Sequence, residues 1–249
     1  MADFSTRKAT LLGRSDHSRK GAIDESIAPL VDLLNASPAY CTTSSCSGRT
    51  TVFVSEQTLD DAWEKAKGGR WCYTTHSAAN AYDLIESLRS VLAPTATRVS
   101  AVFKFEPFVL HVETRSIADA QSLLRGAMAA GCRNSGMTIS KNGKIITAVR
   151  NTLTLEVPLV DHGVLLVTDE YIHHLVKVSN DKMKENNRRI ARFYDFAKAL
   201  PLLSQKEAAQ KISSRKREKS NKEKIKKSDT NATVDEIDLD LDLLWSATT

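Results

Sequence analysis

The sequence of 249 residues lacks any hydrophobic run that approaches the roughly 20 residues of a membrane-spanning helix. Its N-terminal segment also lacks the apolar core of a secretory signal. The four cysteines include no Cys-x-x-Cys pair and are too few for a disulfide scaffold in a chain of this length. These absences favour a cytoplasmic protein with reduced thiols and no membrane contact.

Several catalytic and cofactor motifs are missing as well. The sequence has no G-x-G-x-x-G and no P-loop, which argues against a Rossmann or phosphate-loop enzyme. The serines at 45 and 47 do not form a G-x-S-x-G nucleophile elbow, because the required first glycine is absent. A zinc site from Cys41, Cys46 and a histidine is an alternative, but a single pair five residues apart is a weak signal, and we expect no metal.

The charge is distributed unevenly along the chain. The net charge is +5, but residues 206–227 hold ten Lys/Arg against three Glu, and residues 229–242 hold six Asp/Glu and no base. Such a segment cannot bury enough apolar surface to offset its chain entropy. We therefore expect a domain over residues 1–204 and a disordered tail over 205–249, basic and then acidic, with transient helix in its lysine-rich part.

Residues 1–204 alternate helical and strand patterns, which is typical of a mixed α/β domain. A helix from Asp24 ends near Asn35, and the last long helix is expected to break near Asn180. Two segments, WCYTTH at 71–76 and FVLHVE at 108–113, each run from a strand through a histidine into a helix, which suggests an internal duplication. Further strands are expected at 50–55, 70–75, 98–105, 108–114, 133–140, 144–150 and 153–157, and helices at 58–66, 78–92, 117–130 and 169–200.

The segment YCTTSSCSGR, residues 40–49, is predicted to form a loop between that first helix and a strand. It combines hydroxyl donors, a glycine that permits close approach to the backbone, and an arginine fork suited to carboxylate or phosphate. These features indicate an anion site. A polar turn whose hydroxyls cap neighbouring backbone groups is the alternative.

Two histidines at strand ends, His76 and His111, could act as general bases, because a neutral imidazole accepts a proton near pH 7. A hydrogen-bonded structural role is the alternative for each. The charges of Lys104 and Glu106 in FKFEP are expected on one solvated strand face.

Seven segments also occur in a recognisable order: DHSRKGAID (16–24), SPAYCTTSSCSGR (37–49), WCYTTH (71–76), FKFEPFVLHVE (103–113), AAGCRNSGM (129–137), LEVPL (155–159) and EYIHHLVKVSNDKMKENNRRIARF (170–193). Together they resemble the wybutosine-synthesis methyltransferase family over residues 16–193. The tail lies outside this resemblance.

The resemblance implies an S-adenosylmethionine-dependent enzyme that methylates ring nitrogen N-4 of the 4-demethylwyosine-type guanosine next to the anticodon of phenylalanine tRNA. It implies an α+β fold in which two β3α2-type repeats form a mixed, barrel-like sheet with flanking helices, without a Rossmann domain. Other classes stay open: a non-catalytic tRNA-binding module of the same fold, or a small-molecule enzyme unrelated to RNA. The tail could serve as a nuclear-import signal or as a tether for tRNA.

The resemblance also implies site residues. As catalytic residues we expect His76, His111 and Asp24. The residues expected to bind the methyl donor are Ser45, Ser47, Gly48, Arg49, Ser135 and Gly136, and those expected to bind the substrate are Ser18, Lys20, Thr43, Ser44 and Glu106. Whether the 40–49 segment holds the donor or an anionic group of the substrate is left open.

Overall fold

The computed structural model describes residues 3–14, 21–56, 69–92 and 99–229, and beyond residue 200 only the course of the backbone. The chain divides into two compact units, Met1–Leu200 and Pro201–Thr249. The elements in order are α1 (Phe4–Leu12), the 3-10 helix η1 (Glu25–Ile27), α2 (Ala28–Ala36), β1 (Tyr40–Glu56), β2 (Arg70–Thr75), α3 (Ala81–Val91), β3 (Val99–Thr114), α4 (Ile117–Ala129), β4 (Gly136–Ile139), β5 (Ile145–Arg150), β6 (Leu155–Asp161), β7 (Val164–Leu165) and α5 (Asp169–Asp229).

The strands form one seven-stranded sheet in which all pairings are antiparallel, in the order β2-β1-β3-β5-β4, with β6 on the remaining half of β3 and β7 beside β6. This confirms the expected α+β, non-Rossmann class. The barrel-like closure is not found, because no pairing among the described residues joins β2 to β4. The sheet is open, and the long ladder between β1 and β3 forms its centre.

Strand β1 contains the whole of the segment predicted to be a loop, so that prediction was wrong. β1 pairs with β3 from Tyr40, opposite Thr114, to Glu56, opposite Val99. The two strands predicted around Pro107 are likewise one continuous strand. The hydroxyl-rich sequence of 40–49 has little strand propensity of its own. It forms a strand because its backbone groups pair with β3, and strand formation depends on the neighbouring strand more than on local propensity.

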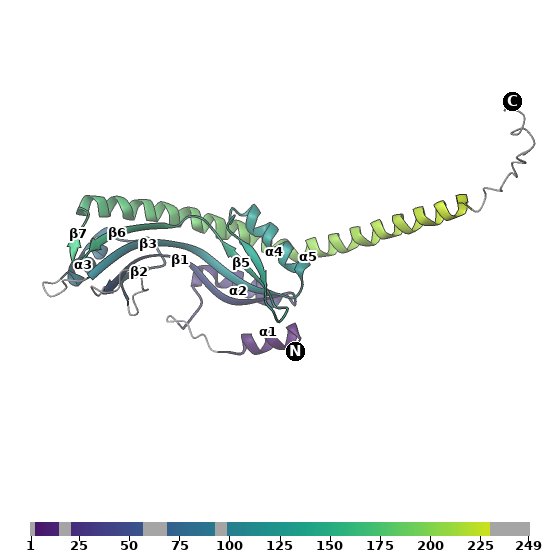
Figure 1. Cartoon of the computed structure of the whole chain (residues 1–249), viewed down its shortest axis with the longest axis horizontal. Coiled ribbons are helices and arrows are strands. Elements are labelled where there is room, and N and C mark those ends of the chain that lie inside the picture. Colours follow the sequence, from purple (N-terminus) through teal and green to yellow (C-terminus); the bar gives the residue numbers. More distant parts are fainter. Residues whose placement is uncertain (1–2, 15–20, 57–68, 93–98, 230–249) are drawn as a thin grey trace, which may run out of the picture. The chain divides into compact units, whose positions relative to one another are not determined.

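One face of the sheet is covered and the other carries polar side chains. The helix α5 runs along the long strands (Figure 1), and two clusters of buried residues fill the space beneath it, one with α2 and α4 and one with α3. In β3 the side chains of Phe103, Phe108 and Leu110 belong to these cores, and Phe105 is buried as well. The alternate positions form what we call the open face: Ser44, Cys46, Arg49, Lys104, Glu106, Val109, His111 and Arg150.

The inward positions of β3 change from odd to even residues across Pro107, which lies opposite Gly48 in β1. Gly48 has φ +103°, a conformation that disfavours residues with a β carbon. A β carbon there would also lie 3.0 Å from Nδ2 of Asn186 and 3.2 Å from the backbone nitrogen of Phe108. Glycine is therefore required where the two halves of the ladder meet.

The helix α5 is continuous through Asn180, so the predicted break was wrong. The Asn180 side chain instead accepts a hydrogen bond from the backbone N–H of Ala79 at 2.7 Å and donates one to its carbonyl at 3.0 Å. The backbone is helical through Asp229, which includes the lysine-rich part where transient helix was predicted, and the predicted disorder of 205–249 stays a prediction. Residues 230–249 and the helix predicted at 58–66 lie outside the described residues. No helix of the described part is long and apolar enough to span a membrane.

Asn186 of α5 is fully buried and connects the helix to both central strands. Its Nδ2 donates to the carbonyl of Ser47 at 2.8 Å, and its Oδ1 accepts from the backbone N–H of Phe108 at 2.7 Å. Both backbone groups belong to buried residues. The amide of Asn186 thus satisfies two backbone groups at the point where Gly48 and Pro107 interrupt the regular alternation.

We predict that Asn186→Ala lowers the free energy of unfolding by about 2 to 4 kcal/mol, because each buried backbone group left without a partner costs about 1 to 3 kcal/mol. Urea denaturation measures the change. The control is Asn187→Ala, an exposed neighbour on the same helix, which should change stability by less than about 0.5 kcal/mol. Equal stability of the two variants would contradict the structural role of Asn186.

Candidate functional site

Asp24 lies directly before η1 and reaches the edge of β1. Its Oδ2 accepts hydrogen bonds from the backbone N–H of Ser47 at 2.8 Å and from the Ser47 hydroxyl at 2.9 Å. Strand β2 pairs with β1 only from Thr50 onward, so it does not cover this part of the edge. The carboxylate is buried and oriented by these two bonds, which links two residues that the sequence analysis had assigned separately.

His76 and Cys46 complete a cluster around this carboxylate. Nε2 of His76 lies 3.8 Å from Oδ2 of Asp24, and 33% of the His76 side chain is exposed. The ligand atoms of Asp24, Cys46 and His76 all lie within 4.8 Å of one another. We call Asp24, Cys46, Ser47 and His76 the Asp24 cluster.

The Asp24 cluster offers two kinds of chemistry. Nitrogen, oxygen and sulfur donors together match the ligand set of zinc. Burial raises the pKa of the Cys46 thiol, however, which disfavours the thiolate that a metal or an electrophile would need. The second possibility is proton transfer at His76, with the carboxylate of Asp24 stabilising the positive charge that forms on the ring.

Arg49 and Glu106, expected to bind different ligands, face each other across β1 and β3. Nε of Arg49 donates to Oε2 of Glu106 at 2.5 Å. The guanidinium also lies 4.6 Å from the ring centroid of Trp71 in β2, a cation–π arrangement. The position of Arg49 on the open face is therefore fixed by an ion pair and by an aromatic ring.

A second group of predicted residues forms one row across four strands of the open face. Ser44 of β1 lies opposite His111 of β3, His111 opposite Ala148 of β5, and Ala148 opposite Gly136 of β4. Neighbouring strands lie about 4.8 Å apart, so the row spans roughly 14 Å. Nothing lies within 4 Å of a β carbon built at Gly136. The row therefore continues from His111 through a small residue on β5 to open space at Gly136 on β4.

Both ring nitrogens of His111 are occupied. Nε2 lies 3.1 Å from Nη2 of Arg150, and Nδ1 lies 2.9 Å from the hydroxyl of Ser44. Because a guanidinium only donates, Nε2 is the acceptor, and Nδ1 carries the proton and donates to Ser44. Burial, and secondarily the charge of Arg150, lower the pKa of His111, so the ring is neutral near pH 7.

Ser135 acts on the backbone of Arg150. Its hydroxyl accepts from the N–H of Arg150 at 2.9 Å and lies 2.6 Å from the carbonyl of Cys132. These bonds join the loop before β4 to the end of β5. Ser135, expected to bind the methyl donor, thus has partners within the protein.

The other predicted residues differ in their placement. The Thr43 hydroxyl donates to the carbonyl of His111 at 3.2 Å and is exposed. Ser45 lies opposite the buried Leu110. Ser18 and Lys20 lie outside the described residues.

The sequence analysis missed Trp71, Arg150 and Asn186. Trp71 belongs to the segment WCYTTH, and its aromatic ring could have been considered as a partner for the arginine of 40–49. The roles of Arg150 and Asn186 depend on strand register and helix docking, for which the local sequence holds no signal.

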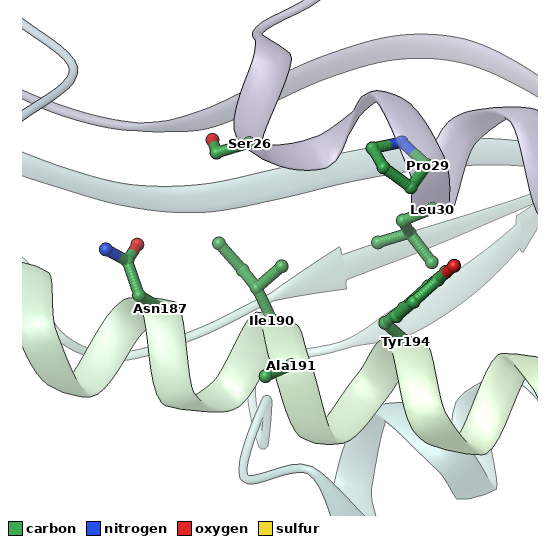
Figure 2. A pocket seen from close by; sticks show the side chains of 7 residues that line it. All are labelled: Ser26, Pro29, Leu30, Asn187, Ile190, Ala191 and Tyr194. Carbon is green, nitrogen blue, oxygen red and sulfur yellow. The ribbon is translucent and has the colours of Figure 1, made fainter.

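A separate cavity of about 350 Å³ lies on the covered side of the sheet, between α2 and α5 (Figure 2). Its lining is mostly apolar and includes none of the predicted site residues: Ser26, Pro29, Leu30, Asn187, Ile190, Ala191 and Tyr194. The candidate site is therefore not this cavity but the Asp24 cluster together with the adjoining open face.

A family model, known protein sequences and solved structures were each compared with this chain, and the three comparisons agree. The family described as "Methyltransferase TYW3" matches residues 5–199. The tRNA wybutosine-synthesizing protein 3 homologs of Xenopus laevis and Bos taurus are 45% and 42% identical over 191 and 193 residues, which are 77% and 78% of this chain and 73% and 72% of those proteins. The PH1069 protein from Pyrococcus horikoshii OT3 superposes with a TM-score of 0.64 at 27% identity, over 80% of this chain and 96% of that one. The matched residues contain the Asp24 cluster and the open face, and the chain belongs to the methyltransferase TYW3 family.

Proposed function

We propose that this chain is an S-adenosylmethionine-dependent tRNA methyltransferase of wybutosine biosynthesis. Its target is ring nitrogen N-4 of the 4-demethylwyosine-type base next to the anticodon of phenylalanine tRNA. The observation that carries the proposal is the family match over residues 5–199, which includes every described residue of the candidate site. The non-catalytic alternative has less support, because a histidine with an accessible ring stands beside an oriented carboxylate.

The polar groups fit the amino acid end of such a methyl donor. Arg49 carries the charge that attracts a carboxylate, and its side chain and that of Glu106 are 31% and 41% exposed. An ion pair at this exposure is screened by water, so exchanging Glu106 for a ligand carboxylate costs little. Asp24 and the hydroxyls of Thr43 and Ser44 supply acceptors for an amine. When bound, the donor supplies the methyl group that the ring nitrogen takes up.

The chain itself contributes position and a proton acceptor. His76 is the better base of the two histidines, because neither ring nitrogen of His111 is unengaged. The carboxylate of Asp24, held by Ser47, stabilises the imidazolium that forms when His76 accepts the proton from N-4. The Cys46 thiol stays protonated near neutral pH, so it does not compete as a nucleophile.

The charged segment 206–227 has two proposed roles, nuclear import or tethering of tRNA through its phosphates. A cytoplasmic site of action is the expectation from the sequence, and the import role would modify it.

The function is tested by transfer of a labelled methyl group from S-adenosylmethionine to phenylalanine tRNA isolated from cells that lack this protein. Mass spectrometry of the digested tRNA then locates the label on the modified base. The fully modified tRNA from normal cells is the control and should accept no methyl group. Donor binding without transfer to the undermethylated tRNA would favour the binding-module alternative.

We predict that His76→Ala lowers kcat by roughly 10²-fold or more, because it removes the general base. Thermal stability should be nearly unchanged, because the side chain is exposed. His162→Ala serves as a control at another exposed histidine and should keep full activity. Wild-type turnover of His76→Ala between pH 6 and 9 would assign proton removal to another group.

Arg49→Ala should weaken binding of the methyl donor roughly tenfold to 150-fold, the effect of losing a hydrogen bond to a charged group worth about 1.5 to 3 kcal/mol. Isothermal titration calorimetry measures the change. Lys104→Ala is the matched control, since it removes the neighbouring cation of the open face, which pairs with Glu156. Equal donor affinity in Arg49→Ala and wild type would remove Arg49 from the donor site.

Removal of metal should leave the methyl transfer rate unchanged. Burial raises the pKa of the Cys46 thiol, so the cluster lacks the thiolate that a metal ion would need, and Oδ2 of Asp24 already accepts two hydrogen bonds from Ser47. Elemental analysis of the purified protein and assays after chelation check this. One equivalent of zinc per chain, with activity lost on its removal, would instead make the cluster a metal centre.

A further inference from the structure

Arg150 is held in a defined orientation on the open face. Its backbone N–H is bonded to the Ser135 hydroxyl at 2.9 Å, and its Nη2 donates to Nε2 of His111 at 3.1 Å. His111 is itself oriented by Ser44 at 2.9 Å. A guanidinium has five N–H donors, and one of them is used by His111. Among the described residues the guanidinium makes no other hydrogen bond, so its remaining donors are available to a ligand.

The charge of Arg150 is not neutralised by the protein. No carboxylate pairs with it in the part of the chain that the structure describes, whereas Arg7, Arg49 and Arg89 each pair with an acidic residue. Its partner His111 is a neutral ring, because burial and the nearby guanidinium lower the pKa of that histidine. An oriented, uncompensated guanidinium is suited to an anion rather than to a structural contact.

The residues around Arg150 in the sequence add to the positive electrostatic potential at this place. Residues 132–154, which include β4 and β5, contain four basic residues, Arg133, Lys141, Lys144 and Arg150, and no Asp or Glu. All four are exposed. Like charges gathered on one hairpin raise the local concentration of anions.

There is also room for a ligand beside the guanidinium. Ala148 and Gly136 continue the row that begins with Ser44 and His111, and nothing lies within 4 Å of a β carbon placed at Gly136. Beyond His111, this row of the open face therefore carries only small residues on β5 and β4.

We propose that Arg150, positioned by His111 and Ser135, is an oxyanion-binding residue of the site that takes a carboxylate or a phosphate. The identity of the ligand rests on the proposed function, which offers the carboxylate of the methyl donor and the phosphates of tRNA. An anion can bind Arg150 without breaking an ion pair of the protein, whereas an anion that binds Arg49 must displace Glu106.

The test compares Arg150→Gln with wild type in the full-length protein. Binding of S-adenosylmethionine is measured by calorimetry, and binding of phenylalanine tRNA by fluorescence anisotropy at several salt concentrations. A roughly tenfold to hundredfold loss is expected in one of the two. Loss of donor affinity alone identifies a carboxylate. A weaker tRNA complex whose slope of log affinity against log salt is shallower by roughly 0.7 to 0.9 identifies a phosphate.

Arg188→Gln is the matched control, because Arg188 is an exposed arginine of α5 and the helix covers the other face of the sheet. Arg150→Lys should recover only part of the affinity, since an ammonium keeps the charge without the planar fork. Unchanged affinity for donor and tRNA in Arg150→Gln would overturn the proposal.

A second variant guards against a folding defect in Arg150→Gln. Gly136→Leu adds a large side chain to the same row of the open face and keeps Arg150, and it should weaken the same ligand while thermal stability is kept. Ala118→Leu on the exposed surface of α4 adds bulk elsewhere and should have no effect. Wild-type binding of both ligands by a folded Gly136→Leu would count against a ligand on this part of the open face.

These measurements are separate from the function itself. If wild-type protein transfers no methyl group, the proposed function fails, but anion binding is still measurable with inorganic phosphate, followed by the NMR signals of the His111 ring. A phosphate-dependent shift in wild type that disappears in Arg150→Gln supports the anion site. No shift, together with no loss of donor or tRNA binding, refutes it.

Discussion

The structure depends on the amide of Asn186, which holds the ladder of β1 and β3 where its regular alternation fails. Gly48 and Pro107 face each other there, and the inward side of β3 changes from odd to even residues. The amide of Asn186 satisfies the carbonyl of Ser47 and the N–H of Phe108, so the interruption leaves these groups bonded. Because the Asp24 cluster, the Arg49–Glu106 pair and the His111 row are arranged around this point, the helix α5 determines the geometry of the site without contributing a side chain to its open face.

Part of this arrangement was predictable. Asp24, Ser47 and His76 were assigned from the resemblance, and they meet at one edge of β1. The helices α2, α3, α4 and α5 were predicted from helical patterns, whereas α1 was not predicted, and the α+β class came from the resemblance. A helical pattern is a local signal, since an amphipathic helix repeats its apolar residues every three or four positions.

What could not be predicted depends on register. Serine and glycine are uncommon in strands, so the residues 40–49 were predicted to form a loop. They form a strand because they pair with β3. The contact of Arg49 with Glu106 and the row from Ser44 to Gly136 follow from strand alignment, because a slip of one residue would turn each side chain to the other face. Arg150 was missed for the same reason. It is the last residue of a predicted strand, but its contact with His111 depends on the register between β3 and β5.

The two histidines show why residue type alone does not assign chemistry. Each was expected near the end of a strand and before a helix, and nothing in the sequence favoured one of them over the other as a base. In the structure Nε2 of His111 accepts a hydrogen bond from Arg150 and Nδ1 donates one to the Ser44 hydroxyl, so the ring connects Ser44 to Arg150. His76 faces a carboxylate that is already fixed by two donors of Ser47 and keeps part of its ring in contact with solvent. A neutral imidazole between two hydrogen-bond partners is suited to binding, whereas an accessible imidazole beside an anchored anion is suited to proton transfer. In the proposed function, holding an anionic ligand and removing a proton are therefore assigned to two histidines with different neighbours.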